Sequence, residues 1–471
     1  MISFSTLDIF ILISFFVVIF IVGLIPKNRD QKDADGFLLS GRKVGLFLFI
    51  LTNVATWYGG ILGVGEFTYR YGLLSWFTQG LPYYIFAFLF ALLFAEKIRS
   101  ASLFTIPDKL EETYNKKVGV ISSVIIFLLV SPAPYLLMIG LLIQMVFDLD
   151  LLTSLFIGIS FSTFYLFRGG YKANIYTDAV QFFIMFIGFF IIVFVAINSW
   201  GDIAFLEDQL PSKFLTFTGE ASPTFIVVWF LIALWTFADP GFHQRCYSAK
   251  TTQVAKYGII ISIFFWALFD LLTTTTGLYA KALLPELSNP VLAFPMLAEK
   301  ILGSGLKGIF YAALLATILS TLNSFLFLSA TTFGRDFISK YRNDSGIENL
   351  TSYTRIGLIA SAIISIVLAY SFTSVIEIWY VLGSVLIPGL LMLIFSAYFP
   401  KLKISSRHAF IESIAAITTS LAWMIIRSFV SQYTVISEIE PMIIGTIVAV
   451  VIHTFSLRSL KLKTKDNLNS V

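Results

Sequence analysis

The sequence has little of what many enzymes and secreted domains depend on. Among its 471 residues there are one cysteine, Cys246, and three histidines, and only 13% of the residues are charged. A single cysteine excludes an internal disulfide. No two histidines have metal-ligand spacing, and no HExxH, GxSxG or phosphate-binding loop occurs. We therefore do not expect an enzyme such as a protease or esterase, nor an ATP-driven pump, and no basic surface indicates nucleic-acid binding.

Apolar residues are present in excess, at 57% of the chain. A soluble core of that composition would leave too little polar surface to stay dispersed. We predict one polytopic, all-α membrane domain over residues 1–471, with the lipid bilayer as its partner. Runs long enough to cross a bilayer give about thirteen helices, near 7–26, 45–70, 74–97, 118–147, 150–167, 174–199, 223–242, 253–282, 294–334, 352–371, 374–398, 409–431 and 437–456.

The charged loops give this layout an orientation. The first apolar run has no basic residue before it and no small-residue cleavage site after it. We expect a retained span with the N-terminus outside, and a cleaved signal peptide is the alternative. With that orientation, 26 of the 32 Lys and Arg residues fall on the cytoplasmic side, as the positive-inside rule requires. The expected location is the plasma (inner) membrane, with the C-terminus in the cytoplasm.

Two places interrupt the apolar pattern in a way that a straight helix does not tolerate. Adjacent glycines loosen the second span at ATWYGG, 55–60, and FADPG, 237–241, interrupts the seventh. Five helices separate the breaks, so two five-helix sets, 44–199 and 223–398, would run in opposite directions. Matching breaks in inverted halves are the best sequence pointer to a transporter site. A first helix with its cytoplasmic loop, two extra helices and a cytoplasmic tail would occupy 1–43, 406–457 and 458–471.

The ninth span carries a cluster of hydroxyl groups. Ser320 and Thr321 are adjacent, and Thr317 lies one turn earlier. A hard cation prefers several oxygen ligands, which hydroxyls and freed carbonyls supply without burying a negative charge. The alternative is that the hydroxyls bond to their own helix or join two helices. We favour the cation site because a broken helix offers the matching carbonyls.

Four motifs, in this order, resemble those of one known family, the sodium:solute symporters, which includes sodium/glucose, proline and sialic-acid cotransporters. They are FLLSGRKVG, RGGYKANIYTDAVQ, ADPGFHQRCYSAK and ALLATILSTLNS, at 37–45, 168–181, 238–250 and 313–324. The resemblance implies a LeuT-like fold of two inverted five-helix repeats. It also implies that a sodium gradient drives import of a small polar organic solute by alternating access.

The resemblance further implies a sodium site, carried over position by position. The sodium ion would be held by the carbonyls of Ala55, Tyr58 and Thr317 and by the hydroxyls of Ser320 and Thr321. The family usually has a slightly longer segment between its Ala-Thr-Trp and the next glycine. The register of the second-span ligands is therefore open by a residue or two.

Three aspartates are candidates for roles in coupling. In relatives, an aspartate placed like Asp178, next to Thr177, is linked to sodium release or to a second sodium; helix N-capping is the alternative. Asp239, before Pro240, is either a turn residue or a gating residue. Asp270 lies near mid-membrane, where an ionisable group is costly, so we expect gating or coupling; a paired structural aspartate is the alternative.

The expected solute wall is mostly aromatic, and its residues are Asn53, Trp57, Glu66, Tyr83, Trp235 and Trp379. Sugar transporters of this family use several polar amides and acids that are not clearly present. We therefore favour a small amino acid, carboxylate or similar polar metabolite. Glu66 has an alternative partner in Arg70, four residues later on the same helix face. Gln244 and Arg245 are expected to be cytoplasmic anchors.

Two rival functions remain open. A proton-coupled or uncoupled carrier of the same fold would titrate Asp270 or Asp178, and uptake driven by a pH gradient without sodium would indicate it. A transporter-like sensor would need a cytoplasmic output domain, for which the tail after residue 457 is too short. The sequence does not indicate the sodium stoichiometry or the oligomeric state.

Overall fold

The computed structural model describes residues 3–26, 34–342, 347–372, 375–429 and 439–469. Within these residues, eleven helices are long and apolar enough to cross a membrane. A twelfth span is a helix pair bent by 52° between Leu386 and Pro388, and a shorter apolar helix covers Leu151–Phe164. Together they agree with the thirteen helices expected.

The first five-helix set begins with an interrupted span. α3 (Leu46–Trp57) passes through a 3₁₀ turn, Tyr58–Gly60, into α4 (Ile61–Tyr71). α11 holds two spans, because Gly170 has a φ of 57° and a Cβ there would lie 2.7 Å from Phe37. The helices that complete this set are α5 (Leu73–Gln79), α6 (Leu81–Phe90), α7 (Glu96–Ala101), α9 (Lys116–Leu129), α10 (Ala133–Phe147) and α11 (Leu151–Trp200).

The second set also begins with a broken helix. α13 (Pro223–Ile232) leads to the short α14 (Trp235–Ala238), and an extended Asp239 precedes α15 (Pro240–Ser248). Pro240 has no amide hydrogen, so it starts a helix but cannot continue one. Both breaks therefore lie where the sequence predicts them. The other helices of this set are α16 (Thr252–Leu283), α18 (Leu306–Thr331), α20 (Ile347–Ser371), α21 (Val375–Leu386) and α22 (Pro388–Tyr398).

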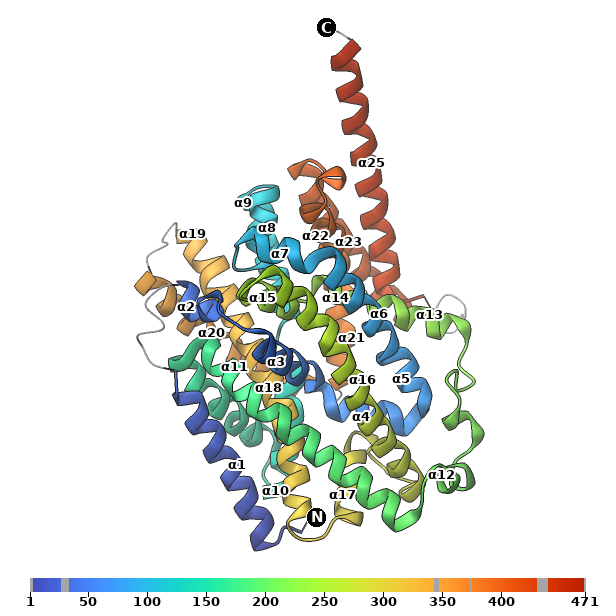
Figure 1. Cartoon of the computed structure of the whole chain (residues 1–471). Helices are drawn as coiled ribbons and strands as arrows, with labels where there is room; N and C mark the ends of the chain where they lie inside the picture. The colour runs from blue at the N-terminus through green and yellow to red at the C-terminus, as the bar shows by residue number, and fades with distance from the viewer. Residues whose placement is uncertain (1–2, 27–33, 343–346, 373–374, 430–438, 470–471) are drawn as a thin grey trace.

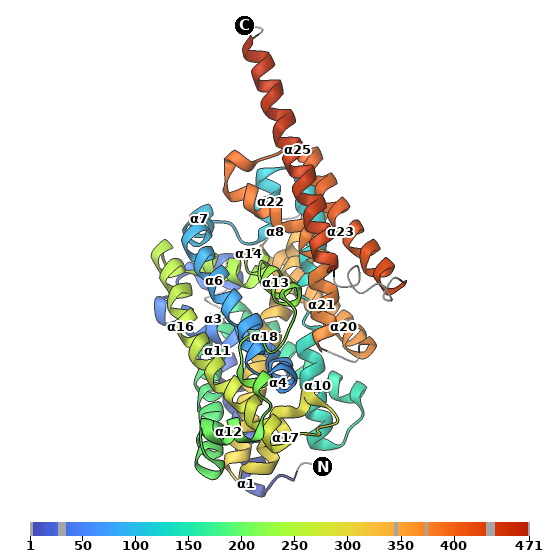
Figure 2. The same cartoon turned by 90° about the vertical axis from the view of Figure 1, so that its right-hand side faces the viewer.

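Further helices flank the two sets. α1 (Thr6–Leu24) precedes them, and α23 (Ser406–Phe429) and α25 (Pro441–Asn469) follow. Figures 1 and 2 show the two termini at opposite ends of the bundle, as an odd number of crossings requires, with α25 extending beyond its neighbours. Short helices between the spans are α2 (Ala34–Leu39), α8 (Ile106–Thr113), α12 (Ile203–Gln209) and α17 (Ala293–Ile301).

α18 forms the centre of the bundle. Almost all of its residues are buried, and it packs against α1, α3, α11 and α20 (Figure 1). α1, by contrast, exposes a face of large apolar side chains that includes Phe10, Ile13 and Ile21, as expected of a helix that faces lipid. α18, which carries Ser320 and Thr321, is thus shielded from lipid by the helices around it.

Asp8 joins α1 to the start of α18. Its Oδ1 accepts the backbone N–H groups of Gly305 at 2.8 Å and of Gly308 at 2.7 Å, and its Oδ2 accepts the Ser5 hydroxyl at 2.7 Å. The carboxylate is fully buried. It therefore satisfies amides at the N-terminus of α18 that have no partner within the helix.

An ion-pair cluster joins α8 to the helical continuation of α18. Asp108 lies 2.8 Å from Arg335 and 2.8 Å from Lys340. Burial raises the pKa of Asp108, but the two positive charges outweigh burial and lower that pKa to about 2. The lowered pKa means that the cluster stabilises the folded state at physiological pH and loses this effect only as the pH falls toward that value.

Asp8→Ala should lower the apparent melting temperature of the purified protein. The change leaves the buried amides of Gly305 and Gly308 without their acceptor, which costs about 1–3 kcal/mol for each unsatisfied group. Thermal unfolding in detergent measures the shift, with Glu207→Ala at an exposed position on α12 as the control. If the two variants melt at the same temperature, Asp8 does not hold the bundle together.

Candidate functional site

The interrupted span and the hydroxyl-bearing helix meet in the middle of the bundle. The Ser320 hydroxyl on α18 lies 2.8 Å from the Ala55 carbonyl oxygen on α3 and 2.9 Å from the Thr317 carbonyl oxygen. The Thr321 hydroxyl lies 2.7 Å from the Thr56 carbonyl oxygen. All five residues are buried. Five uncharged oxygens from two helices therefore converge in one place.

Gly59 permits this close approach. It lies in the 3₁₀ turn, and a Cβ there would be 2.2 Å from the Cβ and the hydroxyl of Thr321. No side chain fits between the helices at that distance. Gly59 therefore brings the carbonyls of α3 within reach of α18.

The structure brings together four of the five residues expected to bind sodium: Ala55, Thr317, Ser320 and Thr321. The difference concerns Tyr58, because Thr321 contacts the Thr56 carbonyl instead. The Tyr58 hydroxyl donates to the Trp266 carbonyl at 2.6 Å. The interruption of α3 is a single 3₁₀ turn rather than a full break. The shape of this turn determines which carbonyl of α3 faces Thr321. A ligand role for the Tyr58 carbonyl stays a prediction.

A buried polar network begins one turn away. Asp178 on α11 accepts hydrogen bonds from the hydroxyls of Thr52 at 2.5 Å and Thr56 at 3.3 Å, and from the Asn174 amide at 3.2 Å. Asn174 also donates to the Ser324 hydroxyl at 2.6 Å. Asp178 and Asn174 together thus connect α3, α11 and α18. The Oδ1 of Asp178 has no hydrogen-bond partner among the described residues.

Arg245 closes this network from α15. Its guanidinium donates to the Thr56 hydroxyl at 2.5 Å, to the Thr52 carbonyl at 3.3 Å and to the Gly241 carbonyl at 3.1 Å. Arg245 is only 3% exposed, so it is not the cytoplasmic anchor that the sequence suggested. A buried guanidinium near Asp178 offsets part of the cost of burying that carboxylate.

Sequence reasoning missed several members of the network, and two of them carry a usable signal. Asn174 lies four residues before Asp178, and Ser324 lies four residues after Ser320. Residues four apart share a helix face, so each lies beside a residue already singled out. Thr52 and Thr56 show the same spacing on α3, although nothing else in the sequence distinguishes them.

Thr177 does not belong to the network. Its hydroxyl donates to the carbonyls of Ala173 and Asn174 within its own helix. The sixth span begins at Gly169, so Thr177 and Asp178 lie beyond its first turn. Helix N-capping therefore does not explain either residue.

The other two aspartates have different partners. Asp239 caps α15, since its Oδ1 accepts the Phe242 N–H at 3.0 Å and its Oδ2 accepts the Trp235 indole N–H at 3.3 Å. This geometry supports the turn interpretation of Asp239. Asp270 accepts a hydrogen bond from the Tyr84 hydroxyl, and within the described chain it forms no ion pair.

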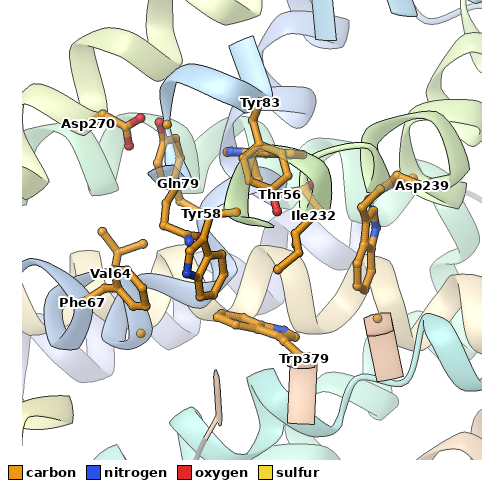
Figure 3. A pocket seen from close by; sticks show the side chains of 18 of the residues that line it. Thr56, Tyr58, Val64, Phe67, Gln79, Tyr83, Ile232, Asp239, Asp270 and Trp379 are labelled. Atoms are coloured by element: carbon orange, nitrogen blue, oxygen red, sulfur yellow. The ribbon is translucent and has the colours of Figure 1, made fainter. Parts of the chain in front are cut away.

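A cavity of about 240 Å³ lies beside the two helix breaks. Asp239 and Asp270 both line it, and Figure 3 shows them on opposite sides, with Tyr58 between them. Of the residues expected to contact the solute, those that line the cavity are Asn53, Trp57, Tyr83, Trp235 and Trp379.

Glu66 is not among the residues that line this cavity, so its contact with the solute stays a prediction. Its Oε1 instead accepts the Arg70 Nε–H at 3.0 Å. The two residues lie four apart on one face of α4, so the pair forms within a single helix. Glu66 is buried at this position by the packing around α4.

Comparison with known proteins identifies this architecture. The profile of the sodium:solute symporter family matches residues 37–415. The chain belongs to the sodium:solute symporter family. As a member it is a multi-pass membrane protein that couples the transport of a small solute to sodium.

Two curated relatives of this symporter are similar over most of their length. The sodium/glucose cotransporter of Vibrio parahaemolyticus is 25% identical over 88% of this chain and 85% of its own. The high-affinity choline transporter 1 of Caenorhabditis elegans is 24% identical over 83% of this chain and 74% of its own. Their names give different solutes, so membership of the family does not identify the solute of this symporter.

A solved structure confirms the fold. A sodium-coupled sialic acid symporter in a substrate-bound, outward-open state aligns with a TM-score of 0.81 at 16% identity. The alignment covers 97% of this chain and 98% of that one. The predicted LeuT-like architecture of inverted repeats is thereby established for this symporter.

Gly59→Ala should weaken sodium binding. The added methyl group would lie 2.2 Å from Thr321 and force α3 and α18 apart, which separates their oxygens. Binding of radiolabelled sodium to the purified protein should weaken at least about tenfold, a change of about 1.4 kcal/mol. Gly45→Ala is the matched control, because a Cβ there meets nothing within 4 Å. Equal sodium affinity in the two variants would contradict the need for this close approach.

Proposed function

We propose that this symporter imports a small polar organic solute with sodium across the plasma membrane by alternating access. Its N-terminus would lie outside and its C-terminus in the cytoplasm. The observation that carries the proposal is the convergence of oxygens from α3 and α18 beside a cavity that both helix breaks border. Secondary transporters bind ions and solutes where broken helices meet.

The donor set suits sodium. The ion would be held by the carbonyls of Ala55 and Thr317 and the hydroxyls of Ser320 and Thr321, with a carbonyl of the turn at 56–58 completing the site. A hard cation takes oxygen ligands, and thiol or imidazole groups are not needed. Because all of these oxygens are uncharged, the site favours an ion with one positive charge over one with two.

Sodium and solute would act on the same stretch of α3. Ala55 and Thr56 present carbonyls to α18, while their neighbours Asn53 and Trp57 line the cavity. An ion that orders this stretch therefore also positions part of the solute wall. If this stretch of α3 differs between the outward-open and inward-open conformations, sodium binds the two with different affinity. Coupling requires such a difference.

Asp178 would receive sodium on its way to the cytoplasm or hold a second sodium ion. Thr52 and Ser324, which belong to its network, lie one turn from the ion-binding oxygens, toward the basic ends of α3 and α18. A carboxylate on that path lowers the energy of a departing cation. Arg245 moderates the attraction, so the ion is not trapped.

Replacing both hydroxyls, with Ser320→Ala and Thr321→Ala together, should abolish sodium binding. The variant loses two ligands and leaves the facing carbonyls unable to enclose an ion alone. Binding of radiolabelled sodium should fall at least about tenfold, with the protein still present in the membrane. Thr332→Ala is the control, because that hydroxyl donates to the Leu328 carbonyl within its own helix, one turn earlier. Undiminished sodium binding in the double variant, or uptake driven by a pH gradient without sodium, would refute the proposed site.

Asp178→Asn should slow sodium exchange across proteoliposomes. Asparagine keeps the size of the side chain but removes the charge that draws the ion, so exchange should fall at least about tenfold. If Asp178 holds a second ion, the number of sodium ions bound at saturation should also fall. Asp202→Asn, at an exposed cap of α12, is the control. Unchanged exchange together with unchanged stoichiometry would remove Asp178 from the sodium path.

A further inference from the structure

We propose that the solute is a small organic cation, a tertiary or quaternary ammonium compound, held beside Asp270 by aromatic rings. The inference rests on the proposed symport at the same cavity and names the class of solute. It differs from the amino acid or carboxylate that the sequence favours. Three observations support it: the balance of buried charge, the position of Asp270 and the chemistry of the wall.

The buried charges at this site are unequal. Among the described residues that line the cavity or belong to the Asp178 network, Asp178, Asp239 and Asp270 are acidic and Arg245 is the basic one; each is at most 9% exposed. A charge in the bundle without a counter-charge is costly. With a single sodium ion bound, as when Asp178 serves only the release path, one excess negative charge is left when all four groups are ionised. A solute with one positive charge balances it, whereas a zwitterion leaves it and an anion increases it.

Asp270 is the carboxylate available to a solute. Asp239 is engaged in capping α15 and in accepting the Trp235 indole N–H, and Asp178 shares its network with Arg245. The structure places the hydroxyls of Tyr84 and Tyr58 next to Asp270, and both are uncharged. Figure 3 shows its carboxylate at one side of the cavity that it lines.

Aromatic rings form much of the remaining wall. Five of the eight tryptophans of the chain line the cavity. The ring of Trp57 packs edge-on against Tyr83, with centroids 5.2 Å apart, and Trp379 lies so close to Gly60 that a Cβ there would be 2.0 Å from its ring. Ring faces attract cations, and most strongly where water is excluded. Because this attraction needs no hydrogen-bond acceptor, it suits an ammonium group that is substituted with carbon.

The polar groups of the wall carry no excess of positive charge. The terminal nitrogens of Arg245 donate to the Thr56 hydroxyl and to two backbone carbonyls, and its Nε has no partner among the described residues. Asn53 and Gln79 each have a buried side-chain nitrogen without a partner among the described residues. An uncharged oxygen on the solute, such as a hydroxyl or a carbonyl, would satisfy these amides.

The test compares two probes of one shape with the full-length protein purified in detergent. The first probe is hydroxyethyl-trimethylammonium, and the second is its neutral isostere, in which carbon replaces the charged nitrogen. Thermal stabilisation is measured in sodium and in potassium. The ammonium probe should stabilise the protein in sodium with an apparent affinity at least about tenfold higher than that of the isostere. Glucose, proline and lactate should not displace it.

Asp270→Asn provides a second measurement. It should weaken binding of the ammonium probe at least about tenfold, while binding of radiolabelled sodium to the protein without solute is retained. Asp202→Asn is the control, because that acid is exposed on α12. If Asp270→Asn does not fold, the comparison of the two probes on the unmodified protein decides.

The outcomes separate this inference from the proposed function. If the two probes bind equally, if no ammonium probe binds, or if glucose, proline or lactate takes its place in sodium, the solute is not an organic cation; sodium symport is unaffected. If the ammonium probe binds equally in sodium and in potassium, the proposed coupling of solute to sodium is contradicted. The inference that the solute is an organic cation is then retained.

Discussion

The structure depends on the contact between an interrupted helix and a helix that carries two adjacent hydroxyls. Inside a bilayer, a carbonyl released from its own helix has no water to bond with and must find another partner. Here the hydroxyls of Ser320 and Thr321 satisfy the carbonyls of Ala55 and Thr56 at 2.8 and 2.7 Å. A sodium ion would use the same oxygens, so the ion and the helix contact compete. Binding would then exchange hydrogen bonds between helices for ligands to an ion, and this exchange would allow sodium to shift the balance between conformations.

Buried charge is the second constraint. Asp178 and Arg245 lie close together around the hydroxyls of α3, whereas Asp270 has an uncharged partner. If the solute is a cation and one sodium ion binds, the four ionised groups are neutralised only when sodium and solute are both bound. A transporter with one cargo would then carry an uncompensated charge during its conformational change, which a low-dielectric interior penalises. Under this account, charge balance would itself favour movement of the fully loaded protein.

The parts of this structure that sequence predicts are those set by length and by special residues. Hydrophobic length gives the number of spans, and the glycines at 59–60 and Pro240 mark the two breaks. The ligand register on α3 is harder, because one 3₁₀ turn decides whether Thr321 meets Thr56 or Tyr58. Periodicity places Glu66 on one face of α4, but it does not show whether that face borders the cavity or another helix. Arg245 looks like the basic end of a span, but in the fold it is buried and donates to Thr52 and Thr56 of α3.

The most direct test of the central claim is a density map of the protein prepared once in sodium and once in potassium. In sodium, we expect density enclosed by the Ala55 and Thr317 carbonyls and the hydroxyls of Ser320 and Thr321, with the Ser320 hydroxyl no longer bonded to Ala55. In potassium, that density should be absent and the hydrogen bond should remain. A map in sodium that keeps the bond between Ser320 and Ala55, with no density between α3 and α18, would contradict the account.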